Sequence, residues 1–182
     1  AEGSSEHVSG KGGLGLVSSR LTVGGPMKKG SNKGTWQISG RRSYADVFLR
    51  FSSDTALSQN IAYFYDLNGK ATYKVDDNDK LFLSSYFGRD VFSFGDDFGF
   101  NWGNGTASLR WNHTYSDSLF SNMSVVYTKY DYDIGVPQGE NEFSWQSGIQ
   151  NLNFNWEFER LLSSKSKVKY GAQINSYFYT PG

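Results

Sequence analysis

Two short charged motifs have the residue types needed to bind an anionic ligand. Arg41 and Arg42 are adjacent, with Tyr44 two residues further on, and Arg89 is followed by Asp90. A guanidinium group offers planar, bidentate donors to a carboxylate or a phosphate, in a geometry that lysine cannot match. The simpler interpretation, which we favour, is that these charges line a wall or rim and pair with neighbouring residues.

Aromatic residues cluster directly after the second motif. Their rings could supply a stacking surface to a sugar or to an aromatic ligand. Phe94 and Trp102 from this cluster complete the set of candidate ligand contacts. The whole cluster consists of Phe92, Phe94, Phe98, Phe100 and Trp102.

Three other motifs resemble known sites and have simpler explanations. Residues 10–15 fit the G-x-G-x-x-G string, but residues 16–23 are strand-like, whereas a nucleotide site needs a helix there. Residues 76–79 (DDND) lack the closing glutamate of a calcium loop, so we interpret them as a solvated hairpin turn. Asp96 and Asp97 are slightly better metal candidates, although an ordinary loop role is favoured.

The sequence contains no constellation that points to catalysis. His7 and His113 are the only histidines, cysteine is absent, and no G-x-S-x-G string marks a nucleophile. Lysine plus arginine and aspartate plus glutamate both number 18, so no basic excess indicates nucleic acid. We therefore expect no enzyme activity, no catalytic residue, no metal or cofactor, and no nucleic-acid partner.

The elements that must carry these residues are β-strands. Aromatic residues make up 17% of the chain and hydrophobic residues only 37%, with 21 glycines and 3 prolines. Apolar and polar residues alternate at 61–75, 103–113, 151–159 and 168–174, which is typical of strands with one apolar face. The longest runs exceed the about 5–6 residues usual in soluble domains and suit the about 9–11 of a tilted membrane-crossing strand.

The predicted connections come in two sizes that alternate along the chain. Bacterial outer-membrane barrels have this pattern, with short periplasmic turns and long external loops. Short turns are predicted at 28–33, 76–79, 116–118 and 163–166, and longer connections near 51–60, 91–101 and 133–141. One helical turn is predicted at 43–51. The predicted strands are 4–12, 14–26, 34–44, 60–75, 80–91, 102–115, 118–132, 142–160 and 166–179.

The fold class is therefore all-β, an antiparallel transmembrane β-barrel segment of about eight or nine strands. The number of predicted strands is odd, whereas a closed single-chain bacterial barrel has an even number. Either the first predicted strand is not a strand, or the chain is part of a larger barrel.

Three stretches resemble TonB-dependent outer-membrane receptors of the kind common in Bacteroidetes. They are GGLGLVSSRLTVGGPMKKG (12–30), ISGRRSYADVFLRF (38–51) and the run from YFYDLNGK to SLRWNH (63–113). The resemblance implies the N-terminal part of a barrel of about 22 strands, without its plug. Residues 1–12 would be the junction after the plug, and residues 13–182 a single segment of barrel strands and loops.

The resemblance also implies a function and partners. The parent protein would import a scarce nutrient across the bacterial outer membrane, and this segment would supply wall and loops. Its partners would be outer-membrane lipid, the rest of the barrel and plug, TonB acting through the plug, and a surface lipoprotein. Two alternatives remain open: a self-contained eight-stranded outer-membrane barrel with a structural or adhesive role, and a soluble β-barrel or sandwich that binds carbohydrate.

The alternation predicts which way each side chain points, because a shift by one residue would place charges in hydrocarbon. The side chains expected to face lipid are Leu67, Ala71, Tyr73, Leu109, Trp111, Leu152, Phe154, Trp156, Tyr170, Ala172 and Ile174. Those expected to face the lumen are Asn68, Lys70, Thr72, Arg110, Asn153, Asn155, Lys169 and Gln173.

Overall fold

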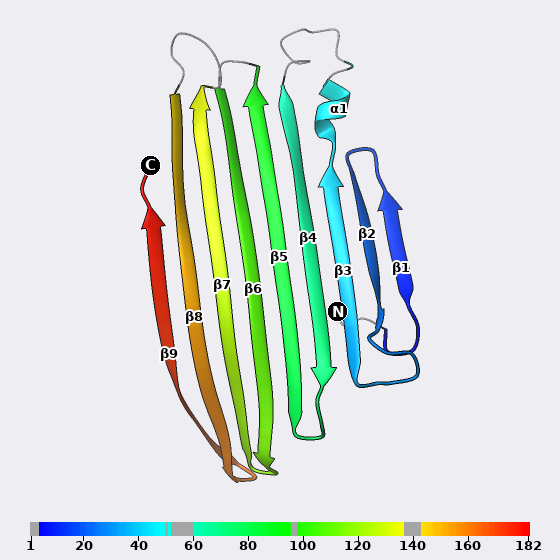
Figure 1. Ribbon diagram of the computed structural model, residues 1–182, viewed down its shortest axis with the longest axis vertical. Helices are drawn as coiled ribbons and strands as arrows, with labels where there is room; N and C mark the ends of the chain where they lie inside the picture. Colours follow the sequence, from blue (N-terminus) through cyan, green and yellow to red (C-terminus); the bar gives the residue numbers. More distant parts are fainter. Residues whose placement is uncertain (1–3, 50, 52–59, 96–97, 137–142) are drawn as a thin grey trace.

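The computed structural model describes residues 4–49, 51, 60–95, 98–136 and 143–182, which form one antiparallel sheet of nine strands (Figure 1). Each strand pairs with the next one along the chain, so the sheet is a continuous meander. Within the described residues, β1 and β9 are each paired on one side only, and the sheet is open. The protein is therefore all-β, with a single short helix among the residues described.

The strands lengthen from 6 residues in β1 to 21 in β8. The helix α1 (Ala45–Leu49) confirms the predicted helical turn. The strands are β1 (Ser9–Leu14), β2 (Ser18–Pro26), β3 (Gly34–Ser43), β4 (Ile61–Lys74), β5 (Asp79–Phe94), β6 (Phe98–Ser116), β7 (Leu119–Val136), β8 (Phe143–Ser163) and β9 (Ser166–Thr180).

The connections fall at two ends of the sheet (Figure 1). We call the end with the connections after β2, β4, β6 and β8 the turn end, and the opposite end the loop end. The predicted short turns all lie at the turn end. None of the described residues forms a helix that is long and apolar enough to cross a membrane.

The pairing register sorts the side chains onto two faces, because directly paired residues lie on the same side of a sheet. One cross-strand row contains Trp36, Ala71, Leu83, Leu109, Val125, Phe154 and Ile174. The side of the sheet that carries this row is called the Leu109 face. The opposite side, the Arg110 face, has the neighbouring row Gln37, Lys70, Ser84, Ser108, Val126, Asn153 and Asn175.

This arrangement confirms that the alternation sorts the two predicted sets of residues onto opposite faces of the sheet. Every residue predicted to face lipid lies on the Leu109 face, and every residue predicted to face the lumen lies on the Arg110 face. Phe82 is an aromatic residue among the polar side chains of the Arg110 face, where Arg110 and Lys80 stand 4.3 Å and 5.0 Å from its ring centroid and cover it.

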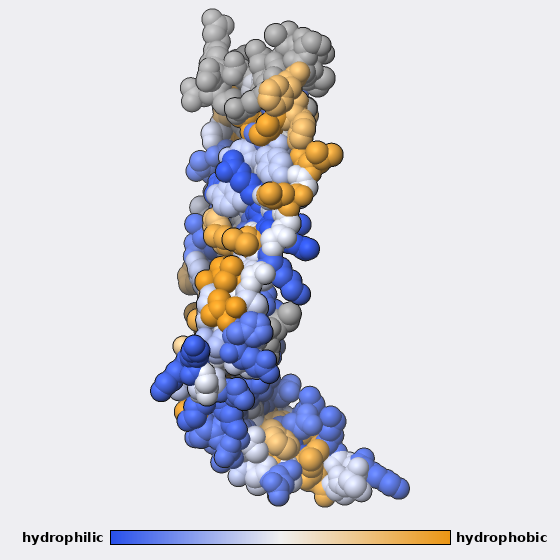
Figure 2. Space-filling view, turned by 90° about the vertical axis from the view of Figure 1, so that its right-hand side faces the viewer, coloured by the Kyte–Doolittle hydropathy of each residue, from blue (hydrophilic) through white to orange (hydrophobic). Residues whose placement is uncertain are grey.

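The apolar side chains of the Leu109 face form a band instead of a core. Leu83, Leu109 and Ile174 are 53%, 50% and 65% exposed, and the described residues contain no buried hydrophobic core. From Tyr73 to Leu67 along β4, at about 3.3 Å per residue, the band is about 20 Å tall. Viewed from the β1 edge, the sheet is a single layer whose lower end curves to one side (Figure 2).

Several predicted boundaries were wrong. The first strand begins at Ser9 and ends at Leu14, so residues 4–8 do not belong to it. The long connection predicted at 91–101 is instead mostly strand, since β5 continues to Phe94 and pairs with Phe98 of β6. Gly95 has a φ of 51°, which suits a tight turn at this point.

The other two predicted long connections can be compared only in part. The predicted connection at 133–141 begins too early, because β7 continues to Val136. The remainder of that connection, and residues 52–59, lie outside the described residues.

Candidate functional site

Strand geometry separates the predicted charged residues onto two faces. Neighbouring residues of a strand point to opposite sides of a sheet. Arg41 therefore lies on the Arg110 face with Asp66, its cross-strand partner, and Arg42 lies on the Leu109 face opposite Tyr65. The two adjacent arginines cannot reach one small ligand together. Arg89 and Asp90 are separated in the same way.

Arg41 is held by its neighbours on the Arg110 face. Its Nε lies 2.8 Å from Oδ2 of Asp66, and its guanidinium carbon lies 4.7 Å from the ring centroid of Phe64. Asp66 is only 9% exposed, whereas the side chain of Arg41 is 51% exposed. This geometry agrees with the simpler interpretation, in which Arg41 pairs with an adjacent strand.

The predicted aromatic cluster is formed, and it lies at the loop end of β5 and β6 on the Arg110 face. Phe92 is 4.5 Å from Phe94 and 5.2 Å from Phe100, measured between ring centroids. Phe98 is 5.8 Å from Phe100. The rings of Phe100 and Trp102 are stacked, with centroids 5.1 Å apart and planes 11° from parallel.

Asp90 joins this aromatic cluster through the register of the sheet. It is paired with Trp102 on one side and with Phe64 on the other. Arg41, Asp90, Phe94 and Trp102 therefore share one face at the loop end. Together with the rest of the aromatic cluster they are called the mouth cluster.

The remaining predicted residues lie outside the mouth cluster. On the Leu109 face, Nη1 of Arg89 lies 3.6 Å from Oδ2 of Asp131, and Nη2 donates to Oδ1 of Asn101. Arg42 lies 5.5 Å from the ring centroid of Tyr63 on that face.

Tyr44 fastens the end of β3 to the connection between β1 and β2. Its hydroxyl donates to the carbonyl of Gly15, and its N–H donates to the carbonyl of Val17 over 2.9 Å. The side chain thus stabilises the sheet beyond the last paired residue of β3.

Sequence reasoning missed Asp66, Asn101 and Asp131, the partners of the two paired arginines. Each is far from its arginine along the chain and adjacent only through the pairing of strands. The available signal was an opposite charge on a predicted neighbouring strand, and it identifies a partner only when the register is known.

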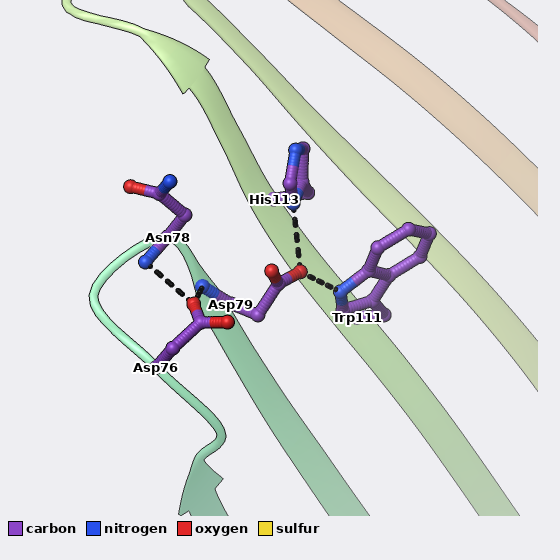
Figure 3. A network of polar contacts seen from close by, with 5 residues as sticks. All are labelled: Asp76, Asn78, Asp79, Trp111 and His113. Carbon is purple, nitrogen blue, oxygen red and sulfur yellow. Dashed lines mark hydrogen bonds and ion pairs between the residues drawn. The ribbon is translucent and has the colours of Figure 1, made fainter.

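The acidic motif at 76–79 builds a turn and anchors the strand that follows it (Figure 3). Oδ1 of Asp76 accepts the backbone N–H groups of Asn78 and Asp79, both over 2.8 Å. Asp79 accepts from the indole N–H of Trp111 and lies 2.7 Å from Nδ1 of His113. The turn interpretation is confirmed, because these carboxylates hold backbone and neighbouring side chains.

The third carboxylate of this turn has a partner of its own. Nζ of Lys74 donates to Oδ1 of Asp77 over 2.5 Å, and this hydrogen bond and charge hold the pKa of the Asp77 carboxyl below its usual range. Across the described residues, no group of three His, Asp or Glu side chains is arranged to hold a metal ion. Asp96 and Asp97 lie outside those residues.

The glycine string at 10–15 is also explained by strand structure. Gly10, Gly12 and Gly13 lie in β1, and the next element is the strand β2. No helix follows, so the nucleotide interpretation lacks the element that it needs.

Comparisons with protein-family models, with curated proteins and with solved structures found nothing that matches this chain.

The ion pair between Arg41 and Asp66 gives a testable stability difference. We expect Arg41→Ala to lower the free energy of unfolding by about 2 kcal/mol, because it leaves a nearly buried carboxylate without its charged partner. Asp66→Asn should cost about 1 kcal/mol, since the half-exposed guanidinium regains water. Urea unfolding of both variants and of the double variant in lipid vesicles measures their coupling. Additive losses would contradict the pairing, and Arg42→Ala is the matched control.

Proposed function

We propose that this chain forms a stretch of the wall of a TonB-dependent transporter barrel in the bacterial outer membrane. In this proposal the Leu109 face meets lipid and the Arg110 face lines the lumen. The observation that carries it is an exposed apolar band on one face of a single-layer sheet that has no hydrophobic core within its described residues. A soluble domain must bury its apolar strand faces against a second layer.

The dimensions of the band support the proposal. Its height of about 20 Å is close to the apolar belt of about 25 Å on transmembrane barrels. Aromatic side chains lie near the turn-end margin of the band, where Tyr73, Trp111 and Trp156 occur in one cross-strand row. Trp and Tyr are enriched at membrane–water interfaces.

Beyond the loop-end margin the two faces exchange character. The Leu109 face becomes more polar, with Asn101, Asp133 and Gln146 following Tyr63 and Val91 in one cross-strand row. The Arg110 face becomes aromatic, at the mouth cluster. A wall that leaves the membrane at this level would present polar groups to water outside, while its inner surface would offer rings to a ligand.

The Arg110 face at the level of the band suits a wet lumen or a polar plug. A shallow hollow of about 430 Å³ lies there, and Lys70, Ser84, Ser108, Arg110 and Ser124 are among its lining residues. Water or polar groups of a plug could satisfy these side chains.

The role of the wall is to hold and pass a nutrient without changing it. At the mouth cluster, the rings of Phe94 and Trp102 would stack on a cyclic or aromatic part of the ligand, and Asp90 would accept its donors. The resemblance assigns the opening of the path to the plug and to TonB. No step of this role requires catalysis or a cofactor.

Single cysteines test the membrane assignment cleanly, because the chain contains none of its own. In the full-length protein, cysteines at Leu109, Val125 and Phe154 should react with a lipid-soluble maleimide and resist a charged one. Cysteines at the next positions, Ser108, Ser124 and Asn153, should react with the charged reagent. Equal reaction of both sets with the charged reagent would refute the membrane assignment.

A second use of the same reagents tests the mouth cluster. A cysteine at Trp102, blocked on intact cells by a bulky impermeant maleimide, should stop nutrient uptake while leaving the amount of receptor unchanged. Unchanged uptake after complete modification would remove the mouth cluster from the transport path. A blocked cysteine at Asn101, the neighbour on the other face, is the control.

A further inference from the structure

Three cationic side chains lie together at the loop-end margin of the apolar band on the Leu109 face. Arg42 and Arg89 occupy the same cross-strand row, each paired with Tyr65, which lies between them. Lys129 is paired with Gly105 in the adjacent row, which also contains Leu67 and is the last row of the apolar band. Since strands are about 4.8 Å apart, Arg42 and Arg89 stand about 10 Å from each other along the row. These three residues are called the cation row.

Among the described residues, the cation row has a single carboxylate, that of Asp131, within ion-pair distance. Nη1 of Arg89 and Nζ of Lys129 both approach Asp131, at 3.6 Å and 4.0 Å, so two cations share one carboxylate. Arg42 lies over the Tyr63 ring. The next acidic residue, Asp133, is one row further from the band and accepts from Gln146 over 2.9 Å and from Ser144 over 3.4 Å.

The opposite margin of the band has a different composition. Its cross-strand row on the Leu109 face is Asp79, His113, Ser121, Phe158 and Tyr170. That row contains a carboxylate and neither lysine nor arginine. The next row outward contains Leu119, Arg160 and Val168, so the turn-end margin has one cation on this face where the loop-end margin has three.

The surface beside the cation row is open enough to admit a tetrahedral anion. Gly103 lies between Arg89 and Asp131 in the row, and a Cβ there would stand 3.5 Å from the Arg89 guanidinium and the Asp131 carboxylate. A hollow of about 370 Å³ adjoins it, and its charged lining residues are Arg89, Lys129, Asp131 and Asp133. The side chain of Lys129 is 54% exposed and can turn towards this space.

We propose that the cation row binds the phosphate groups of phosphorylated lipid headgroups in the leaflet that surrounds the loop end. The inference rests on the proposed function, because it requires the Leu109 face to meet lipid. On a lipid-facing surface, the layer immediately beyond the apolar band is the headgroup layer. Arginine and lysine at that level meet phosphate at short range in a medium of low polarity.

The test uses the full-length protein in phosphatidylcholine vesicles that contain fluorescently labelled lipid A, a phosphorylated glycolipid. Energy transfer from protein tryptophans measures how strongly the lipid gathers around the protein. Removing the phosphates from lipid A should lower its affinity for the wild-type protein. Arg42→Gln with Lys129→Gln should lower the affinity for intact lipid A by about fivefold per cation. Lys70→Gln, a cation of the Arg110 face, should leave it unchanged.

The outcomes separate this inference from the proposed function. If intact and dephosphorylated lipid A bind the wild-type protein equally, headgroup recognition is refuted while lipid contact stands. Displacement of lipid A by millimolar inorganic phosphate would also refute it, because the row would then be a site for the free anion. If labelled lipid of either kind gives no energy transfer, the Leu109 face does not meet lipid, and the proposed function fails as well.

Discussion

Leu109→Arg should sharply reduce the amount of folded protein in membranes, whereas Ser108→Arg should be tolerated. Leu109 lies in the middle of the apolar band and is 50% exposed. In a soluble sheet an exposed leucine can be replaced at a cost within about 0.5 kcal/mol. On a lipid-facing surface an arginine near the bilayer midplane costs about 2–4 kcal/mol. The same substitution therefore separates the two environments.

The adjacent position supplies the matched control. Ser108 is on the Arg110 face, between Ser84 and Val126 in its cross-strand row. The substitution Ser108→Arg therefore adds the same charge at the same height of the sheet, but on the other face. Urea unfolding of the refolded full-length variants in vesicles measures the loss. Equal stability of the two variants would contradict the assignment of the Leu109 face to lipid.

The isolated 182-residue chain should fail to form a stable monomeric barrel in vesicles. Across its 15 residues, β9 pairs with β8 alone within the described part of the sheet, and β1 pairs only with β2. In hydrocarbon, each unpaired backbone donor or acceptor costs several kcal/mol. A row of such groups along both edges outweighs the transfer of the apolar band into lipid.

Gel migration before and after heating provides the measurement, because folded barrels resist detergent and migrate as compact species. We expect the isolated chain to migrate identically under both conditions, and the full-length protein to shift on heating. A heat-sensitive compact monomer of the isolated chain would show that β1 and β9 can close on each other. It would then favour a self-contained barrel over a stretch of a larger wall.

The sidedness of this sheet is readable from sequence because it depends on one local rule. Leu152, Phe154 and Trp156 alternate with asparagines, and a strand places such alternating positions on opposite faces whatever its neighbours are. The same rule predicted β4, β6, β8 and β9, where the alternation is clean. No knowledge of the register was needed.

The β5–β6 connection illustrates why other features could not be predicted. The alternation does continue through Phe92 and Phe94, but with the apolar residues on the other face, so it resembles a break in the pattern. The glycines at residues 95–105 also favour a loop over a strand in a sequence-based prediction. In the proposed membrane setting, the two faces exchange character because their surroundings change along the strand, which a constant pattern of apolar and polar residues does not describe.

The candidate site was likewise predictable only in part. Residue types identified Arg41, Arg89 and the aromatic cluster correctly as a set near one end of the sheet. Sequence adjacency suggested that Arg41 and Arg42 act together, yet strand geometry places them on opposite faces. Their actual partners are set by cross-strand register, which joins residues far apart in the chain.

The lack of a buried core within the described sheet changes which substitutions matter. In a packed interior, a leucine is constrained by the shape of the space around it, and truncation leaves a costly cavity. Leu83 and Leu109 project from the sheet, and fluid acyl chains would fill whatever space a smaller side chain leaves. Exchanges among leucine, valine and phenylalanine in this band should thus change the stability of the folded protein very little. In the proposed membrane setting, the polarity of a side chain in this band is under constraint, and its volume is not.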